Sequence, residues 1–504
     1  MYIISYDIGT TSNKTCLFEV DKSIRLLAHA SGGYALTLTE DGGAEQDPED
    51  WWRSMCATTK QVLEKSGVKP GLVSGISFCS QLQCLVLTDS FGRAVRPAMS
   101  YMDARASEEF EQWSAGPFKI AGVCLKKLIP SLMDTGVVAA SAKDPVFRYN
   151  YVKNREPEAF ARVHKWLDAK DYLIARATGR FIMTNDSAFA TLLYSPKTKR
   201  FSERMARLHH VDMAHLPEIV ASTDPVGPLT REAAEALGLT ENAIVYGGAG
   251  DSNLAGVGAG QANVGDTHAC IGTSGWICTV CDKPAVDTSA MIAAIEGALK
   301  GRYNYFAEME TAGKCLEWAK NIFLSEGASM EEFFRRAEAG SGGVLFAPWL
   351  LGNRCPFEDA YAKAMFFNMR LETTVDNLIS AVLDGVLYQL RWMLEVSNNK
   401  VKGSKVLRLV GGAARSELVS QRFADITGRT IEVPEAPQNT GALGACLLAA
   451  AGAGLMSIEQ GCSLVEVGRR CVPDPEKKAA YDKQYAAFLR LHRNNKKTFS
   501  LLNR

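Results

Sequence analysis

The sequence predicts an α/β protein built from two similar domains, and three observations lead to this prediction. Apolar runs typical of strands alternate with helical patterns along the chain. A strand, a Gly-Thr turn and a second strand open at residues 7–12 and recur at residues 270–275, half a chain later. The length of 504 residues also exceeds the roughly 250–300 residues that one core reaches. We therefore expect two domains that face each other across a cleft.

The first half starts with a pattern typical of a β-meander and continues with a well-marked helix. Asp47 is the expected N-cap of that helix, and Pro48 stands at its first position, where a missing N–H costs nothing. The predicted strands are 3–4, 15–18, 24–30, 73–78 and 84–87, the predicted helix after Asp47 is followed by one near 103–113, and helical patterns dominate 157–237.

The second half starts where the strand 243–246 runs into Gly247-Gly248-Ala249-Gly250-Asp251. We place a domain boundary there and predict an N-terminal domain at 1–247, a C-terminal domain at 248–455 and a terminal helical segment at 456–504. The expected strands are 267–271, 276–280 and Val406–Val410, and the expected helices are 308–322, 375–396, 416–426, 477–491 and the Gly/Ala-rich stretch 441–456.

Composition excludes several classes of protein. Lys plus Arg and Asp plus Glu both number 56, so the formal net charge is zero and no electrostatic footprint for nucleic acid or an anionic membrane is present. The 13 Cys suit small buried positions in a reducing compartment. Because the N-terminus lacks the features of a signal peptide and no stretch is long and apolar enough to span a bilayer, we expect a cytoplasmic protein.

Three glycine turns directly follow predicted strands, at residues 9–12, 272–275 and 411–414. Glycine lets backbone N–H groups approach an anion closely, and consecutive N–H groups can hold phosphate oxygens. A tight β-turn is the alternative for each turn alone, but three of them favour a nucleotide held between two domains. The P-loop, the G-x-G-x-x-G dinucleotide motif and the kinase H-R-D loop do not occur.

Two carboxylates stand next to glycine turns. Asp7 ends the first strand, where it could hold a hydrated Mg²⁺ against phosphates, or could simply bond its own turn. Asp251 follows four small residues at the start of a predicted helix, and it is either an N-cap or a general base for a substrate hydroxyl. We expect the neighbouring glycines to leave room for a substrate.

Taken together, the motifs resemble those of the FGGY carbohydrate kinases, a family with two actin-like (ribonuclease H-like) domains, each a mixed sheet flanked by helices, with a cleft between them. The resemblance covers essentially the whole chain. The motifs that carry it are DIGTTS at 7–12, EQDPEDWW at 45–52, YMDAR at 101–105, KDYL at 170–173, GGAGDS at 247–252, IGTSG at 271–275, GGAARS at 411–416 and GALGA at 441–445.

This resemblance implies transfer of the γ-phosphoryl group of ATP to a sugar hydroxyl, with Mg²⁺ as cofactor and closure of the cleft to exclude water. It assigns the catalytic base to Asp251 and the carboxylate near the metal to Asp7. The implied nucleotide-binding residues are Gly9, Thr10, Thr11, Ser12, Lys14, Gly272, Thr273, Gly411 and Gly412, and the implied sugar-binding residues are Gln81, Leu82, Gln83 and Asp103. Sugar and ATP are the implied partners, and because many members are dimers, a homodimer stays open.

Within the family the chain is most similar to xylulokinases, which implies conversion of D-xylulose to D-xylulose 5-phosphate. It departs from them at Gln81-Leu82-Gln83, where Gln-Met-His is common, at Tyr101-Met102-Asp103, where Trp-Asn-Asp is common, and at Asn353, where Glu is usual.

The first two departures fall on positions implied to bind the sugar. Ribulose, erythritol, gluconate and a deoxy sugar therefore remain alternative acceptors, whereas glycerol is disfavoured because glycerol kinases place Arg-Glu at Leu82-Gln83. A non-catalytic actin-like ATPase is the remote alternative.

Overall fold

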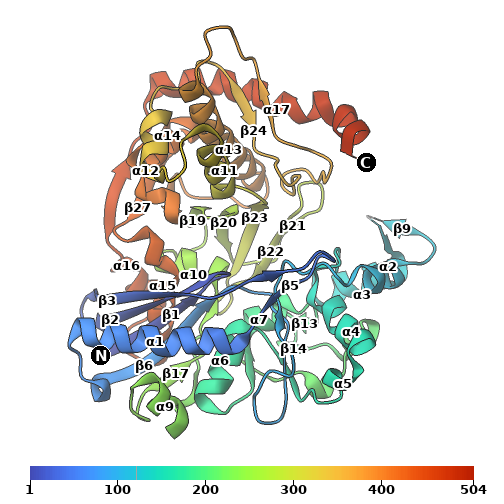
Figure 1. Cartoon of the computed structure of the whole chain (residues 1–504), viewed down its shortest axis with the longest axis vertical. Helices are drawn as coiled ribbons and strands as arrows, with labels where there is room; N and C mark the ends of the chain where they lie inside the picture. Colours follow the sequence, from blue (N-terminus) through green and yellow to red (C-terminus); the bar gives the residue numbers. More distant parts are fainter. Residues whose placement is uncertain (121, 504) are drawn as a thin grey trace. The chain divides into compact units, whose positions relative to one another are not determined.

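The computed structural model describes residues 1–120 and 122–503, so Arg504, the end of the predicted terminal segment, lies outside it. The chain forms two compact units, which we describe separately (Figure 1). Unit 1 comprises Met1–Gly258, Glu296–Lys300 and Gly441–Leu464, and unit 2 comprises Ala259–Ile295, Gly301–Thr440 and Val465–Arg504.

The sheet of unit 1 has the strand order β16-β17-β6-β1-β2-β3, and β18 also pairs with β6. The strands β1, β2 and β3 form the expected antiparallel meander, whereas β6, β17 and β18 run parallel to β1. These strands are β1 (Tyr2–Ile8), β2 (Ser12–Val20), β3 (Ile24–Gly33), β6 (Val73–Ser80), β16 (Pro225–Pro228), β17 (Ile244–Tyr246) and β18 (Ala249–Gly250).

Helices cover both faces of this sheet. The helix α1 (Pro48–Ser66) starts as predicted, because the Asp47 side chain accepts the Glu49 N–H at 2.9 Å, and its apolar face packs with α6 (Ala169–Thr178) on the side chains of Ile4, Tyr6 and Ile8. Strand residues alternate between faces, so Ile3, Ser5 and Asp7 point the other way. That second face is packed by α15 (Thr440–Gly452), the expected Gly/Ala-rich internal helix.

The sheet of unit 2 repeats this topology. Its order is β21-β22-β23-β20-β19-β26-β27-β28, in which β23, β20 and β19 are antiparallel and β26 and β27 run parallel to β19. The predicted repeat of strand, Gly-Thr turn and strand is therefore confirmed as a repeated sheet. The strands are β19 (Thr267–Ile271), β20 (Gly275–Cys281), β21 (Val286–Asp287), β22 (Ile292–Glu296), β23 (Tyr303–Met309), β26 (Val406–Val410), β27 (Thr430–Pro434) and β28 (Val467–Cys471).

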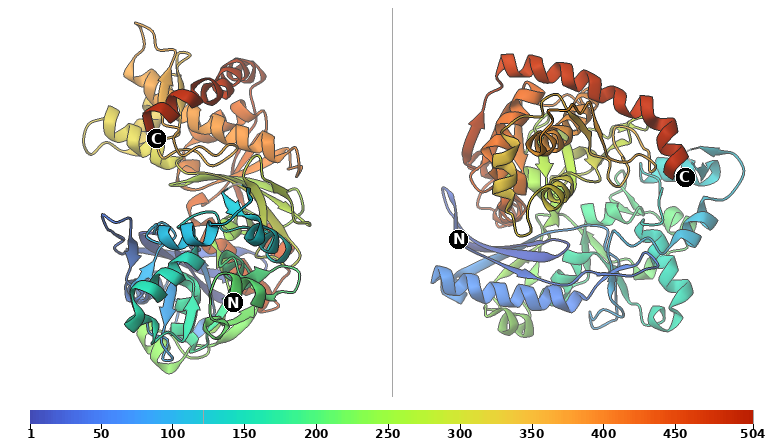
Figure 2. Two further views of the ribbon diagram at one scale, coloured as in Figure 1. Left: turned by 90° about the vertical axis from the view of Figure 1, so that its right-hand side faces the viewer. Right: turned by 45° about the horizontal axis from the view of Figure 1, so that its top comes forward.

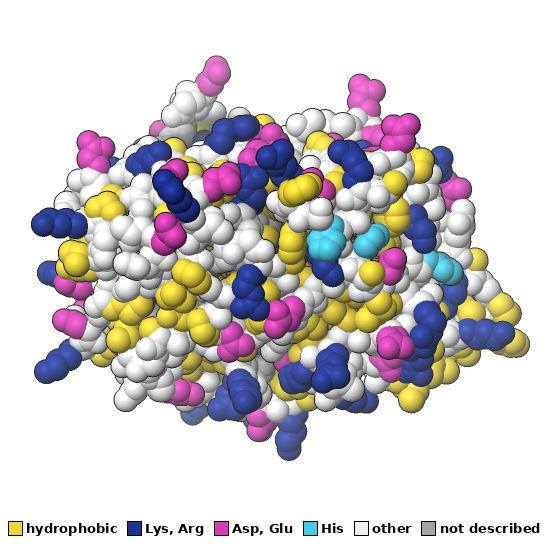
Figure 3. Space-filling model, turned by 90° about the horizontal axis from the view of Figure 1, so that it is seen from below, with side chains coloured by type: hydrophobic (Ala, Val, Ile, Leu, Met, Phe, Trp, Pro, Cys, Tyr) yellow, Lys and Arg dark blue, Asp and Glu magenta, His cyan; other side chains and the backbone are white. Residues whose placement is uncertain are grey.

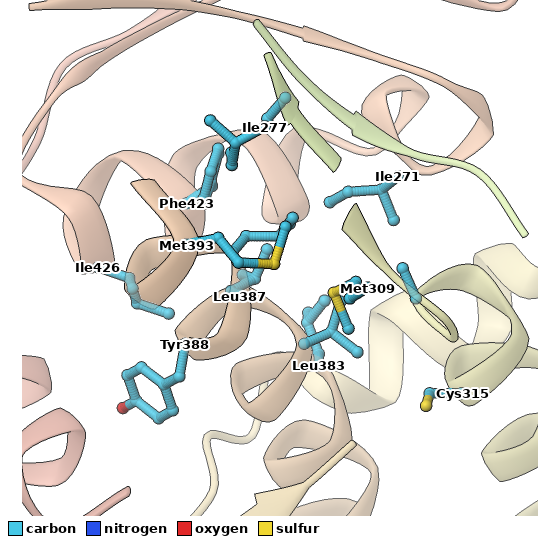
Figure 4. Packing of buried hydrophobic residues seen from close by; sticks show 14 of the residues in the cluster. Ile271, Ile277, Met309, Cys315, Leu383, Leu387, Tyr388, Met393, Phe423 and Ile426 are labelled. Carbon is cyan, nitrogen blue, oxygen red and sulfur yellow. The ribbon is translucent and has the colours of Figure 1, made fainter. Parts of the chain in front are cut away.

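The core of unit 2 surrounds α13 (Val375–Ser397), a helix that is apolar on nearly every side. Leu383, Leu387 and Met393 of this helix lie among side chains from the sheet and from α14 (Glu417–Thr427), as Figure 4 shows. A helix without a polar face is stable only inside a core. The terminal helix α17 (Pro475–Asn503) contributes Phe488 and Leu491 to the same core, so the predicted segment 477–491 is helical but longer than expected.

Two of the predicted helical regions are partly wrong. Short strands interrupt the region 157–237, and the expected helix 308–322 begins only at Gly313, because the alternating aromatic residues before it form β23. Unit 1 also contains β4 (Thr37–Leu38), β5 (Ala44–Gln46), β7 (Val86–Thr88), β8 (Ala98–Met99), β9 (Lys119–Ile120), β10 (Val123–Cys124), β11 (Lys165–Leu167), β12 (Ile182–Thr184), β13 (Tyr194–Ser195), β14 (Arg200–Phe201) and β15 (Glu218–Val220).

The remaining elements are short. They are α2 (Ser107–Ser114), α3 (Leu125–Asp134), α4 (Pro145–Arg155), α5 (Pro157–Phe160), α7 (Asn185–Ala190), α8 (Glu203–Leu208), α9 (Arg231–Leu237), α10 (Asp251–Gly258), α11 (Gly313–Phe323), α12 (Met330–Ala337), α16 (Ile458–Ser463), β24 (Leu345–Ala347), β25 (Met365–Phe367) and the 3₁₀ turns η1 (Pro70–Leu72), η2 (Met213–His215), η3 (Gly412–Arg415) and η4 (Pro437–Asn439). Figure 2 shows the ribbon from two further sides.

The surface and the cysteines agree with the composition. On the face shown in Figure 3, basic and acidic side chains are interspersed. All 13 cysteines are free thiols, and most are buried. Among the helices of the described residues, none has the length and apolarity of a membrane span.

Candidate functional site

Two carboxylates lie at the same edge of the unit 1 sheet. Three parallel strands, β1, β6 and β18, end there, and their register aligns Asp7 with Cys79 and Cys79 with Ala249. Asp251 follows β18 immediately as the first residue of α10. Because neighbouring strands are about 4.8 Å apart, the sheet sets Asp7 and the start of α10 about two strand spacings apart, with the end of β6 between them.

The Asp7 carboxylate is half-buried and closely surrounded. It stands opposite Lys14 across β1 and β2, and a Cβ on Gly441 would lie 3.0 Å from its Oδ2 atom. Burial raises the pKa of the Asp7 carboxyl above its ordinary value, while the Lys14 ammonium and a hydrogen bond from the Cys79 thiol oppose that rise. A carboxylate held in this way gains from any further cation placed beside it.

The turn at residues 9–12, which we call the Gly9 turn, has its carbonyl groups fixed by neighbouring residues. Tyr34 donates its hydroxyl to Gly9 O (2.6 Å) and its N–H to Thr11 O (3.0 Å), and Gln46 Nε2 donates to Thr10 O (2.7 Å). In a trans peptide the next N–H points opposite to the carbonyl. The Thr10 and Thr11 N–H groups therefore point away from Tyr34 and Gln46, as an anion-binding turn requires.

Asp251 is exposed, and its Oδ1 atom accepts the Ser252 N–H at 2.6 Å. The glycines before it have a different purpose from the expected one. Gly248 adopts φ +65°, and a Cβ there would lie 2.1 Å from Phe78 O, while a Cβ on Gly250 would lie 2.3 Å from Leu82 Cδ1. These glycines permit close packing on the end of β6, so the expectation that they leave room for a substrate is wrong.

The loop that follows β6, residues 81–83, lies at the same edge. Gln81 is buried, donates its N–H to Ile8 O (2.8 Å) and its Nε2 to Gln46 Oε1 (2.9 Å), and its Oε1 atom has no hydrogen-bond partner in the described structure. Leu82 is half-buried against Gly250. Gln46 thus connects this loop to the Gly9 turn.

Gln83 is held in the left-handed region, at φ +64°, by two buried side chains. Asp168, the N-cap of α6, accepts the N–H groups of Gln83 (2.8 Å) and Cys84 (3.0 Å). Arg148 donates to Gln83 O (2.5 Å) and to Ser100 O (2.6 Å). Burial, followed by repulsion from Asp171, raises the pKa of Asp168 to about 7.

Asp103 lies in a turn before α2 and is completely buried. Its Oδ2 atom accepts the Ala44 N–H (2.9 Å) and Arg105 Nη2 (2.6 Å), and Arg105 also pairs with Glu45. This carboxylate therefore fixes the segment 101–105 beside β5.

In unit 2, the turn at residues 272–275, which we call the Gly272 turn, follows β19 as the Gly9 turn follows β1. Gly313 N–H donates to Gly272 O (2.8 Å), and Ala312 and Lys314 N–H both donate to Thr273 O (3.1 Å). The Thr273 side chain is exposed. By the same peptide geometry, the Thr273 and Ser274 N–H groups point away from the start of α11.

The third glycine turn follows β26. Gly411 adopts φ +91°, and a Cβ there would lie 2.6 Å from Ile271 O, whereas a Cβ on Gly412 would meet open space. Asn353, which stands where Glu is usual in the similar kinases, is buried and structural. Its Nδ2 atom donates to Phe357 O (2.8 Å), and its Oδ1 atom accepts a hydrogen bond from Gln389 Nε2 (3.1 Å).

Sequence reasoning missed the residues that support these loops, because no motif assigns a role to Tyr34, Gln46, Arg148 or Asp168. Arg148 and Asp168 had a detectable signal, since charged residues flanked by apolar ones at Phe147 and Leu167 are buried only with partners.

Groups of metal-ligating side chains, with three or more His, Cys, Asp or Glu that could hold a metal ion, are absent from the described residues. Asp7 still fits Mg²⁺, which keeps its waters and takes one or two carboxylates.

Comparisons with known proteins agree with this architecture. Residues 2–258 match the N-terminal domain, and residues 268–453 the C-terminal domain, of the FGGY family of carbohydrate kinases. The chain is 27% identical to a xylulose kinase of Escherichia coli, with 98% of both chains covered, and 26% identical to a gluconokinase of Bacillus subtilis, with 89% and 86% covered.

Solved structures show the same fold. A gluconate kinase of Lactobacillus acidophilus has a TM-score of 0.87 at 24% identity, and a xylulose kinase of the same organism has a TM-score of 0.87 at 23% identity, each over 99% of both chains. The two family matches together span most of the chain. It therefore belongs to the FGGY family of carbohydrate kinases, phosphotransferases with an alcohol group as acceptor.

Proposed function

We propose that this chain phosphorylates a ketose with ATP, and that D-xylulose is its acceptor, giving D-xylulose 5-phosphate. The observation that carries the proposal is the edge of the unit 1 sheet where Asp7, the 81–83 loop and Asp251 come together at the ends of parallel strands. Ligands of open α/β sheets bind at such edges. Xylulose kinases among the relatives support the choice of sugar.

Asp251 acts as the general base in this proposal. Its carboxylate accepts the proton of the sugar hydroxyl while that oxygen forms a bond to the γ-phosphorus, and the bond from this phosphorus to the bridging oxygen breaks to release ADP. A carboxylate within hydrogen-bond reach of the hydroxyl can accept this proton. Positioning and charge supply most of the rate in such transfers.

The nucleotide is assigned to the glycine turns. The Thr10 and Thr11 N–H groups in unit 1, the Thr273 N–H group in unit 2 and the Lys14 ammonium could donate to phosphate oxygens. Gly272 donates its own N–H to Ser274 O, and its role is to let the phosphate approach the backbone closely. Gly411 and Gly412 take the adenosine side, where Gly412 leaves open space. Asp7 would hold Mg²⁺, which when bound neutralises charge on the transferring phosphate.

The acceptor site suits a neutral sugar. Gln81 Oε1 is a buried acceptor without a partner, and a sugar hydroxyl could satisfy it. The terminal nitrogens of Arg148 are engaged with backbone carbonyls, although its buried Nε has no partner in the described structure, and Arg105 is already paired with two carboxylates. Both cations are therefore poor receptors for the carboxylate of gluconate, which favours a ketose even though a gluconokinase is among the relatives.

The test is ADP release against a panel of D-xylulose, D-ribulose, erythritol, gluconate, glycerol and a deoxy sugar. We expect the highest kcat/KM with D-xylulose and a loss of at least about 100-fold in Asp251→Asn, since a general base contributes about 10²–10⁴-fold. Asp21→Asn is the matched control, because Asp21 is also exposed and accepts one local backbone N–H. The proposal is contradicted if none of the acceptors in the panel is turned over, or if Asp251→Asn keeps full activity.

A further inference from the structure

A network of buried polar side chains from α6, β12 and α7 is connected to the backbone beside Asp251. Lys170 and Asp171 form an ion pair at 2.5 Å in which both side chains are fully buried. The Lys170 ammonium also donates to Thr184 Oγ1 at 2.5 Å, and this hydroxyl donates to Asp186 Oδ1 at 2.5 Å. Buried charges are costly unless each is paired, so this network of side chains is fixed in one arrangement.

Asp186 links this network to the residues on both sides of Asp251. Its Oδ2 atom accepts the Gly250 N–H at 2.6 Å and Asn253 Nδ2 at 3.0 Å. Asp186 itself is buried, and α7 packs against β18. The two carboxylate oxygens therefore act separately, because Oδ1 is anchored to Thr184 and Lys170 while Oδ2 holds the last residue before Asp251 and the first turn of α10.

We propose that Asp186 is a positioning residue for Asp251, and that Lys170 and Thr184 act with it as one unit that sets where this carboxylate stands. This inference rests on the proposed role of Asp251 as the base and adds the residues that orient it. The exposed Asp251 side chain lies between two glycine-containing segments, and the Ser252 N–H holds its Oδ1 atom from within its own helix. The way in which the backbone on either side is fixed contributes to where this carboxylate stands.

The expected effect follows from the geometry. An amide at position 186 offers a single oxygen, so Asp186→Asn keeps the Gly250 N–H only if its NH2 group faces Thr184. The Thr184 hydroxyl then loses the carboxylate to which it donates and has to accept from both this NH2 group and the Lys170 ammonium. A small displacement of a reacting group costs about 100-fold in rate, and loss of a residue that orients a functional group costs about 10–100-fold. We expect kcat to fall at least 10-fold while KM for sugar and for ATP stays within twofold.

A merely structural role makes a different prediction. Asp186 also stands in the first turn of α7, where a carboxylate stabilises a helix through its dipole. In that case its loss lowers thermal stability and the fraction of folded protein, but the folded enzyme keeps its kcat. The split between kcat and KM, measured per folded molecule, separates the two roles.

The experiment compares four variants of the full chain with the parent in the ADP-release assay, with far-UV circular dichroism to measure the folded fraction. Asp186→Asn and Thr184→Val should lose at least 10-fold in kcat, whereas Thr184→Ser keeps the hydroxyl and should retain kcat within twofold. Asp144→Asn is the matched control, because one oxygen of Asp144 also accepts two N–H groups near a helix start, in this case both from the backbone, of Ala140 and Ser141.

A double variant and amide hydrogen exchange complete the experiment. If the residues act as one unit, the double variant Thr184→Val with Asp186→Asn loses no more than the worse single variant. Amide hydrogen exchange of the peptide 248–256 should quicken in Asp186→Asn and stay unchanged in Asp144→Asn, and this readout needs no activity. Should Asp186→Asn fail to fold, Thr184→Val against Thr184→Ser decides instead.

Unchanged kcat per folded molecule in Asp186→Asn and Thr184→Val, with an active parent, overturns the inference. A parent that is inactive with every acceptor overturns the proposed function instead. In that event hydrogen exchange alone decides whether Asp186 holds the residues around Asp251, and unchanged exchange overturns this inference as well.

Discussion

The Gly9 turn and the Gly272 turn join corresponding strands of two sheets with the same order, yet they are fixed in different ways. In unit 1, Tyr34 and the Gln46 side chain hold the carbonyls, whereas in unit 2 the backbone N–H groups at the start of α11 hold them. Both arrangements turn the next N–H groups outward. The shape of the turn therefore matters more than the residues that impose it.

The two turns differ most in what precedes them. Asp7 stands at the position that Cys270 takes in unit 2, so one copy carries a carboxylate and the other a thiol. The segments that follow the parallel neighbouring strands, β6 and β26, differ as well. The 81–83 loop after β6 offers amide side chains, whereas Gly411 and Gly412 after β26 offer only backbone groups. At these two places, acidic and amide side chains are therefore present in unit 1 and absent from unit 2.

The largest effect is expected from removing the carboxylate that distinguishes the two copies. Asp7→Asn should lower kcat/KM by at least about 100-fold, since a group that stabilises charge in the transition state contributes about 10²–10³-fold. Cys270→Ser is the control in unit 2 and should stay within threefold. ADP release at several Mg²⁺ concentrations checks both variants, and equal losses in the two would remove the distinction between the copies.

The next effect separates two kinds of glycine. In Gly272→Ala the new Cβ meets nothing closer than 3.8 Å, so stability should stay within about 1 kcal/mol, while KM for ATP rises about 10-fold because the methyl group keeps phosphate from the backbone.

Gly248→Ala provides the contrast. Its Cβ clashes with Phe78 O and its φ is positive, so we expect a loss of at least about 2 kcal/mol in the free energy of unfolding. Urea unfolding and ATP titrations measure the two effects. A Gly272→Ala variant with parental KM would show that the Gly272 turn is only a turn.

A smaller effect concerns pH and belongs to unit 1. Because the pKa of Asp168 is raised from its ordinary value to about 7, the folded state binds more protons than the unfolded state between pH 4 and 7. The contribution of Asp168 to stability is therefore fully present below pH 4 and is lost as pH rises through 7.

The variant Asp168→Asn should show a flatter dependence of unfolding free energy on pH across this window. Its stability should also be lower, because the Gln83 and Cys84 N–H groups bind different oxygens of Asp168 and an amide has only one oxygen. Urea unfolding at half-unit pH steps measures the slope. A parent that becomes more stable from pH 4 to 7 with an unchanged slope in Asp168→Asn contradicts this assignment.

The smallest effect should come from the 81–83 loop. Gln83→His restores the imidazole common in xylulokinases, and His is tolerated at positive φ. We expect KM for D-xylulose to change a few-fold, by about 1 kcal/mol for one hydrogen bond, with KM for ATP unchanged. A change in both constants would show that the loop does not act on the acceptor alone.

The sequence is most informative where local rules act alone. Asp47 and Pro48, for example, predict the start of α1. The prediction for the region 157–237 is partly wrong because its strands have two to four residues, too few for a period of two to stand out. The start of α11 is missed because a strand precedes it closely.

For the site, the glycine turns and the two carboxylates can be found from spacing and resemblance. The residues that hold them cannot, since Tyr34, Gln46 and Asp186 act through contacts across many positions of sequence. The reason for Gly248 and Gly250 is also hidden, because it depends on the distance to Phe78 and Leu82.

The hydroxyl of Tyr34 and the amide of Gln46 carry a lesson for protein engineering. A designer who grafts the six residues 7–12 onto another hairpin would transfer the letters of the motif but not the outside donors that orient its peptides. The unit that can be transferred is the whole meander together with β5. It has to include the Tyr34 phenol and the Gln46 amide if the short motif is to keep its conformation.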